Sequence, residues 1–537
     1  MQRINRGIVC LLMCWLMLVG GMAQGQAQYV PSKATDLTTF DGTNMATVLN
    51  NLRLVKPVVI SSAFSGFLVS AVHRAGDVYN VTAGAGITAL AFRSKWIIPN
   101  ACEDLQVVFS NQYMVSETDT AGGGPVTITA SIEDATGALW ACTLRGNTSA
   151  IASTGYPVIF DPVSLRVVAG TTVWIRGYVT FAAGTNPVIT TNAGLSGEWG
   201  ISGTAAAPIT DPTQSKTNDT ANATAGGGGW YLGACAILGK PVGKPSASVA
   251  VLGDSISVQS PHGYIFDAFS GILQYMHLGF GQQKQIDIDN INGQFRAPLI
   301  PYATHAYIQL GTNDFRTNTA ITAQTLINNE ILLIQRCVAA GLKPVCQTIT
   351  PYSLTSSDSY LTTSGQTQAV NETAREGLND WIRGVSLTTL NSTYSISLGT
   401  LTAKATGMIG FVEVADGVET TRNSGKWKTT LGPGGTATSA TTTTLVDSGK
   451  TWTASQYVGW YVAITSGTGA GQQKAITANS VTSVTVTAWT TQPDVTSVYQ
   501  IYAPCTTDGT HPTDIAAGNA GGYQLLHGLI TAATFPL

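Results

Sequence analysis

Three short motifs in this chain carry the residue types that ester hydrolysis requires. Gly253-Asp254-Ser255-Ile256 contains a serine, Gly311-Thr312-Asn313-Asp314 contains an amide side chain, and Asp508-Gly509-Thr510-His511-Pro512 contains a carboxylate and an imidazole. A serine hydroxyl becomes a good nucleophile when an imidazole takes its proton and a carboxylate fixes the imidazole tautomer. Because His511 follows Asp508 by three positions, one tight loop can present both groups.

The three motifs indicate this chemistry together and not singly. A Gly-Asp-Ser tripeptide arises by chance in a chain of this length about one time in ten, whereas all three motifs in order at strand ends form a specific pattern. Hydrolysis through a serine also needs N–H donors for the oxyanion, and removing one such donor costs about 100- to 1000-fold in rate. The chemistry requires no metal or cofactor. The six cysteines beyond residue 27 contain no C-x-x-C pair, which argues against a zinc or redox centre.

These motifs are the blocks of the SGNH, or GDSL-type, serine hydrolases, which the sequence resembles over residues 246–430 and 504–537. The resemblance implies a flavodoxin-like three-layer α/β domain that hydrolyses esters. It implies that Ser255 is the nucleophile, that His511 is its general base and that Asp508 orients His511. The implied oxyanion hole consists of the Asn313 amide and the backbone N–H groups of Ser255 and of a glycine in the second block.

The second block is the least clear part of the resemblance. Asn290-Ile291-Asn292-Gly293 lies at the end of a plausible second strand, so we expect Gly293 to supply the oxyanion donor, with Gly279 and Gly281 as alternatives.

Each motif also has a purely structural interpretation. Ser255 could cap a helix, and Asn313 could form a turn. His262, seven residues after Ser255, is the main rival to His511 but has no carboxylate at a helpful spacing. We expect Asp254 and Asp314 to brace loops and not to take part in the reaction.

The motifs lie in a segment where strands and helices alternate. Short apolar runs at 248–252, 304–310, 343–349 and 408–414 predict strands, and 263–276, 320–340, 367–383 and 514–533 read as helical. Such alternation favours a parallel sheet covered on both faces, with the active loops at the carboxyl ends of its strands.

The segments on either side of these elements predict other structures. Residues 1–27 resemble a secretory signal, with two arginines and an apolar run at 8–19 that is too short to span a bilayer. Residues 28–242 alternate with period two and predict an all-β sandwich of jelly-roll type that includes a Gly- and Thr-rich linker at 210–229. Residues 431–503 contain five short strand candidates, so we expect a small β module inserted into the α/β domain.

Composition narrows the function further. Only 11% of residues are charged and the net charge is −3, which excludes a nucleic-acid binder with a basic face. No stretch beyond the signal predicts a membrane span. We expect an exported serine esterase, secreted or periplasmic, that removes acetyl or similar small acyl groups from a carbohydrate, with an acylated small molecule or polysaccharide as its substrate. The alternatives are a lipase or thioesterase for longer acyl chains, and a non-catalytic glycan-binding surface or virion adhesin. The sequence does not indicate an oligomeric state.

Overall fold

The computed structural model describes residues 67–71, 78–80, 87–115, 118–153, 155–185, 188–190, 197–203, 234–243, 247–258, 264–270, 272–288 and 293–536. The expected signal segment (1–27) and linker (210–229) lie outside these residues. None of the helices that the structure describes has the length and apolar character needed to cross a bilayer.

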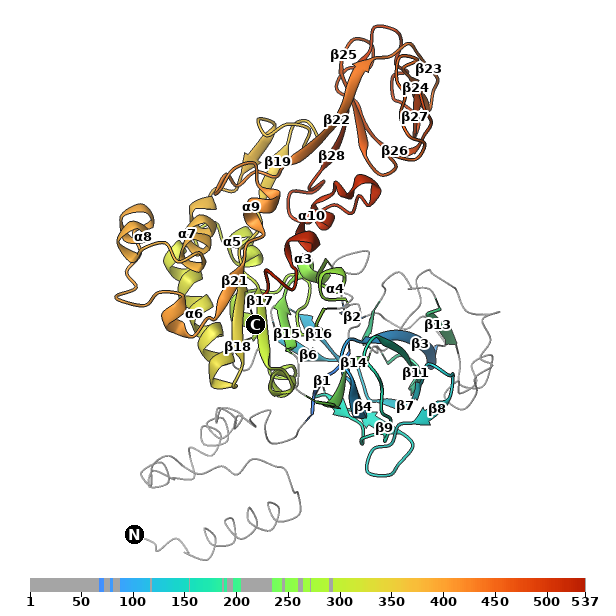
Figure 1. Ribbon diagram of the computed structural model, residues 1–537, viewed down its shortest axis with the longest axis vertical. Helices are drawn as coiled ribbons and strands as arrows, with labels where there is room; N and C mark the ends of the chain where they lie inside the picture. Colours follow the sequence, from blue (N-terminus) through green and yellow to red (C-terminus); the bar gives the residue numbers. More distant parts are fainter. Residues whose placement is uncertain are drawn as a thin grey trace, which may run out of the picture.

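The described residues between 67 and 243 build a β domain of two antiparallel sheets (Figure 1). One sheet has the order β1 (Leu68–Val69), β14 (Ala234–Pro241), β4 (Cys102–Phe109) and β10 (Val158–Ile159). The other has the order β13 (Trp199–Gly203), β3 (Ala89–Ile98), β11 (Thr171–Phe181), β7 (Val126–Glu133) and β8 (Leu139–Ala141), with β9 (Ala150–Ala152) also on β7. Side chains from both sheets, among them Val107, Ile128 and Ile175, share one hydrophobic core.

Two strand pairs extend from these sheets. They are β2 (Val78–Asn80) with β12 (Val188–Thr190), and β5 (Gln112–Val115) with β6 (Thr118–Ala121).

The α/β domain has five parallel strands. Their order is β16 (Gln274–His277), β15 (Ser248–Gly253), β17 (His305–Gln309), β18 (Lys343–Gln347) and β21 (Gly410–Val412). In chain order this is 2-1-3-4-5, the flavodoxin-like arrangement.

Helices cover both faces of the parallel sheet, as expected. Ala250 and Leu252 of β15 pack into the core of α6 (Ala323–Ala339) and α7 (Glu372–Ile382). The alternate residues Val249 and Val251 pack into a second core with α4 (Tyr264–Phe269) and α10 (Gly522–Leu529). The domain therefore has three layers (Figure 1). Its other helices are α3 (Ser255–Val258), α5 (Thr312–Thr317), α8 (Leu387–Tyr394) and α9 (Ala415–Val418), with 3-10 turns at Gln285–Ile288, Ala297–Tyr302, Lys404–Thr406 and Ala517–Asn519.

The second strand corrects the sequence analysis. Residues 263–276 were expected to form one helix, but α4 ends at Phe269 and Gln274–His277 form β16. Parallel pairing with β15 buries Tyr275 and Met276, and this tertiary gain outweighs the helical pattern. Residues 289–292 lie outside the described residues, and Gln285–Ile288, the described segment before them, forms a 3-10 turn and not a strand.

A seven-stranded antiparallel sheet of residues 429–504 extends from the α/β domain at the top of Figure 1. Its order is β22 (Thr429–Thr436), β28 (Val498–Pro504), β25 (Tyr461–Ser466), β26 (Gln473–Asn479), β27 (Ser483–Val486), β24 (Thr444–Val446) and β23 (Ser439–Ala440). The Gly-rich β22 was not expected; it becomes a strand by pairing with β28 around a bulge. Trp452, Trp460 and Trp489 are at most 8% exposed and belong to the core of this module.

The β domain and the α/β domain share a core. Val69, Val108 and Leu238 of the β domain lie in the same hydrophobic cluster as Ala250 and Met276 of the parallel sheet. Ser248 Oγ, at the start of β15, also donates to Val69 O at 2.6 Å. The β domain is therefore packed directly against the sheet that carries the motifs.

Candidate active site

Ser255 follows the first strand of the parallel sheet and begins the short helix α3. The turn that places it is held by the buried Asp254, whose Oδ1 accepts from Ile256 N at 2.9 Å and from Gln309 Nε2 at 3.1 Å. Burial raises the pKa of Asp254 to about 6, although these hydrogen bonds and the charge of the His511 side chain act in the opposite direction. Asp254 thus braces the nucleophile loop, as expected.

His511 and Asp508 lie beside Ser255. His511 Nε2 is 2.9 Å from Ser255 Oγ, and His511 Nδ1 is 2.6 Å from Asp508 Oδ2. Asp508 Oδ1 accepts from the backbone N–H groups of Thr510 and His511, each at 2.8 Å. Burial raises the pKa of Asp508, but the hydrogen bonds from His511 and Thr510 outweigh it and hold the pKa well below its usual value. The carboxylate is therefore ionised and acts as an acceptor for His511.

Gly509 fixes the position of this catalytic loop, residues 506–512. Its φ is +82°, and a Cβ at this position would overlap Ser353 O of β19 (Ser353–Ser356), which pairs with β20 (Gln366–Gln368). Gly509 O accepts from Ser353 N at 3.0 Å and from Trp427 Nε1 at 2.9 Å. The close approach of the β19–β20 hairpin thus requires a glycine here.

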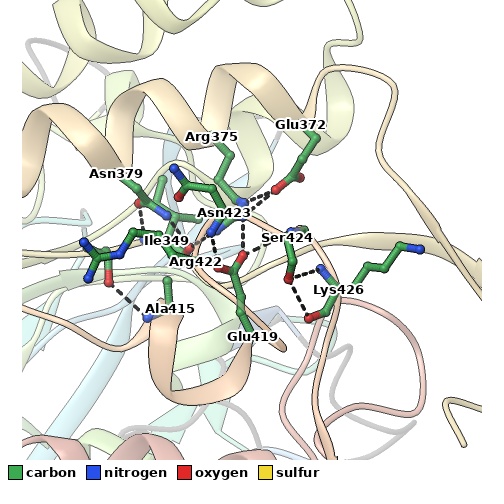
Figure 2. Close-up of polar contacts among 12 residues, drawn as sticks. Ile349, Glu372, Arg375, Asn379, Ala415, Glu419, Arg422, Asn423, Ser424 and Lys426 are labelled. Carbon is green, nitrogen blue, oxygen red and sulfur yellow. Dashed lines mark hydrogen bonds and ion pairs between the residues drawn. The ribbon is translucent and has the colours of Figure 1, made fainter. Parts of the chain in front are cut away.

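A buried charge network around Arg375 includes Glu419, the residue that pairs with Trp427 (Figure 2 shows the network). Arg375 of α7 is fully buried between Glu372 and Glu419, and its Nη1 donates to Ile349 O at 2.7 Å. Glu419 forms a β-bridge with Trp427. The network joins the carboxyl end of β18 to the segment that supports the catalytic loop.

Asn313 lies in the first turn of α5, after the third parallel strand, and is 2% exposed. Its Nδ2 donates to Asp254 Oδ2 at 3.3 Å and to Gln283 O at 3.1 Å. Arg316 Nη2 donates to Asn313 Oδ1 at 3.1 Å, which fixes the direction of the amide. The structure therefore places the amide N–H group of Asn313 next to the residue that precedes Ser255.

The described residues nearest before Gly293, Gln285–Ile288, form a 3-10 turn, so the argument from a strand end does not support Gly293 as the oxyanion donor. The two alternatives, Gly279 and Gly281, follow β16 directly. A Cβ on Gly279 would overlap Gly253 O, so this loop contacts the end of β15. The structure therefore favours the loop of residues 278–283 as the second block.

His277, the last residue of β16, is a residue that the sequence analysis did not use. Its Nδ1 accepts from Gly279 N at 3.1 Å, so a neutral ring carries its proton on Nε2, which lies 2.8 Å from Ser257 Oγ. Ser257 Oγ in turn donates to Asp254 O at 2.8 Å. Desolvation of the ring lowers the pKa of His277 to about 3, so it is neutral at ordinary pH. This second serine–histidine pair joins the loop after β15 to the end of β16. The N–H group of Gly279 is already used, because it donates to His277 Nδ1.

His262, the rival to His511, lies outside the described residues. Asp314 Oδ2 accepts from Gln285 N at 3.0 Å, which is the bracing role expected of Asp314. No group of three or more metal-ligating side chains occurs in the part of the chain that the structure describes.

The parallel sheet has the strand order 2-1-3-4-5, with Ser255 after its first strand, Asn313 after its third, and Asp508 and His511 before its last helix. This is the flavodoxin-like arrangement, with the motif residues at the ends of its strands, that the resemblance to the SGNH, or GDSL-type, hydrolases implies.

Comparisons with solved structures returned esterases and lipases, all at low sequence identity and low TM-score. A GDSL-like lipase from Bacteroides thetaiotaomicron is 17% identical over 34% of this chain and 77% of its own, with a TM-score of 0.22. A psychrotrophic esterase from Pseudoalteromonas sp. is 20% identical over 20% of this chain and 61% of its own, with a TM-score of 0.17. An acetylxylan esterase from Geobacillus stearothermophilus is 10% identical over 33% and 79%, with a TM-score of 0.21. No protein-family model and no curated protein sequence matches the chain.

Proposed function

We propose that this protein hydrolyses carboxylic esters through an acyl-enzyme formed on Ser255. The observation that carries the proposal is the continuous relay from Asp508 Oδ2 through His511 to Ser255 Oγ, with contacts of 2.6 and 2.9 Å. It lies at the carboxyl end of a parallel sheet, where such folds bind their ligands.

The reaction has two steps. His511 Nε2 takes the proton of Ser255 as Oγ attacks the ester carbonyl, and then gives that proton to the departing alcohol. In the second step His511 takes a proton from water as its oxygen attacks the acyl-enzyme, and then returns that proton to Ser255 Oγ as the acyl–Oγ bond breaks and the acid leaves. Asp508 holds the Nδ1–H tautomer and stabilises the imidazolium that forms in each step.

The oxyanion formed in each step needs N–H donors. In this proposal they come from Ser255 N at the start of α3, from a backbone N–H in the loop of residues 278–283, and from Asn313 Nδ2 once the oxyanion replaces one of its two present acceptors, Asp254 Oδ2 and Gln283 O. Because Gly279 N already donates to His277, the loop donor is assigned to the residues that follow it, with Gly281 as the first candidate.

Ser255→Ala is the direct test of the activity. The wild type should hydrolyse 4-nitrophenyl acetate, and the variant should lose this activity while retaining its fold by circular dichroism. Equal activity in a folded S255A variant would refute the proposal. An inactive wild type that binds acetylated glycans would favour the adhesin.

We infer that the substrate is an acetylated small molecule or polysaccharide met outside the cytoplasm. The signal-like sequence at 1–27 supports export, and two facing antiparallel sheets support a β-sandwich of the kind that accompanies many carbohydrate-active domains. A series of 4-nitrophenyl esters of increasing acyl length separates this substrate from that of a lipase or thioesterase. Highest kcat/KM for acetyl fits our inference, and a rise with chain length contradicts it.

The inserted β module is proposed to limit which substrates reach Ser255. Its base contacts the turn of residues 357–361, since Ser359 Oγ donates to Gln473 Oε1 at 3.2 Å and Ser359 O accepts from Tyr502 Oη at 3.3 Å. Tyr360 in the same turn lies against Gly509. Replacing residues 432–502 by a short Gly-Ser bridge should change the preference among acylated substrates; a folded variant with unchanged selectivity would refute this role.

A further inference from the structure

A buried ion pair joins the β domain to the α/β domain beside the candidate active site. Arg296 Nη2 lies 2.7 Å from Asp119 Oδ1, and their side chains are 1% and 0% exposed. Asp119 belongs to β6, and its Oδ2 also accepts from Phe295 N at 3.1 Å.

Arg296 holds the loop of residues 278–283. Its Nη1 donates to Leu278 O at 2.6 Å and to the side-chain oxygen of Gln283, and its guanidinium carbon lies 4.7 Å from the centre of the Phe280 ring. Gln283 Oε1 also accepts from Phe280 N at 3.1 Å. One guanidinium therefore contacts both ends of the loop and its middle.

The same loop touches the reaction centre. Gln283 O accepts from Asn313 Nδ2, and Gly279 lies against Gly253, two residues before Ser255. A shift of the loop would therefore move both the Asn313 amide and the backbone N–H groups that follow Gly279.

We propose that Asp119 and Arg296 are positioning residues for the oxyanion hole, so that the β domain is a working part of the hydrolase and not a detachable appendage. This inference rests on the proposed function. Asp119 supplies the counter-charge that keeps Arg296 directed at Leu278 O and Gln283. Without it, the buried guanidinium would turn toward other acceptors or toward water, because an unpaired buried charge is strongly unfavourable.

Loss of the Asp119–Arg296 pair is expected to lower kcat. The oxyanion appears only during the reaction, so a displaced donor weakens transition-state stabilisation more than substrate binding. A displacement of about 1 Å in an active site costs on the order of 100-fold in rate. We therefore expect Asp119→Asn to lower kcat on 4-nitrophenyl acetate by about 100-fold, with KM changed less than about threefold.

A matched control separates positioning from stability. Glu133 pairs with Arg93 and Arg176, each at 2.7 Å, within the β domain and away from the loop. Glu133→Gln should destabilise the β domain but leave kcat unchanged. The double variant Asp119→Leu/Arg296→Met removes both charges, so it should fold at least as well as Asp119→Asn while kcat stays low, because Leu278 O and Gln283 still lose their donor.

Amide hydrogen exchange gives a readout that does not depend on activity. In Asp119→Asn, exchange should become faster at residues 278–283 and stay unchanged at residues 506–512. Wild-type kcat in folded Asp119→Asn, or an equal loss in Glu133→Gln, would overturn the positioning role. If the wild type hydrolyses no ester, the proposed function fails, whereas the exchange result still decides whether Asp119 holds the loop.

Discussion

Asp508→Asn should disable the enzyme by fixing the wrong tautomer of His511. Asp508 Oδ1 accepts from two backbone N–H groups, Thr510 N and His511 N, and from Thr506 Oγ1 at 3.3 Å. An asparagine would keep its carbonyl oxygen toward these donors and point its NH2 group at His511 Nδ1. Nδ1 must then accept, the ring proton moves to Nε2, and Nε2 can no longer take the proton of Ser255.

The size of the effect follows from the cost of turning the asparagine amide over. The reversed orientation sets an NH2 group against two backbone donors, and each lost hydrogen bond costs about 1 kcal/mol at a half-exposed site. A total of about 2 kcal/mol leaves about 3% of molecules in the productive tautomer, a loss of about 30-fold as a lower limit. The full tautomer effect known for such triads is about 10⁴-fold, or about 5.5 kcal/mol, which sets the upper limit.

The assay is kcat for 4-nitrophenyl acetate near neutral pH, with circular dichroism to verify the fold. Asp494→Asn is a matched control, because Asp494 accepts from Thr496 N and from the Thr496 and Thr468 hydroxyl groups in an exposed turn of the inserted module. It should keep wild-type kcat. A folded Asp508→Asn variant within about threefold of wild type would show that Asp508 does not set the tautomer.

Three further predictions concern the supports of the site. Gly509→Ala should lower both the free energy of unfolding and kcat. The control is Gly384→Ala, where φ is a similar +80° but an added Cβ has no atom within 4 Å, so it should cost only about 1 kcal/mol of stability and leave kcat unchanged. Equal effects of the two substitutions would contradict the close contact of Gly509 with Ser353. His277→Phe should lower kcat about tenfold because it frees Gly279 N and Ser257 from their hydrogen bonds. The pH dependence of kcat between about pH 5 and 8 should not change, since His277 has a pKa of about 3. Loss of this pH dependence in the variant would contradict the prediction. Burial raises the pKa of Glu330 to about 7, so the free energy of unfolding of the wild type should fall as pH rises from about 5 to 8. The free energy of unfolding of Glu330→Gln should rise by up to about 3 kcal/mol relative to that of the wild type over the same range. A difference between the two proteins that stays constant with pH in urea unfolding would disprove this.

The sequence predicts the α/β architecture well because each buried strand is apolar on both faces. β15, β17 and β18 lie where runs such as 248–252 predict them, since both faces of a parallel strand pack against helices. β16 could not be found in this way. It is an edge strand of four residues that directly follows a helix, and only its pairing with β15 makes it a strand.

The contact between Asp508 and His511 could be predicted from the spacing of one motif, and their contact with Ser255 from the expectation that all three motifs lie at one edge of the sheet. Asp508 and His511 are three positions apart, so their contact is local. The block-two glycine could not be predicted, because its assignment depended on where β16 ends. The roles of Asp119, Arg296 and Trp427 were also hidden, since each acts through a contact with residues far away in the chain, and nothing in their local sequence marks such a contact.

Chemical labelling of the nucleophile tests the central claim most directly. The protein is treated with diethyl 4-nitrophenyl phosphate, and the modified residue is located by peptide mass mapping. We predict one diethylphosphoryl group on Ser255 in the wild type and none in His511→Ala, because His511 must take the proton of the attacking hydroxyl. A label on another residue, or an unlabelled wild type that still hydrolyses esters, would contradict the assignment of Ser255 and His511 as nucleophile and base.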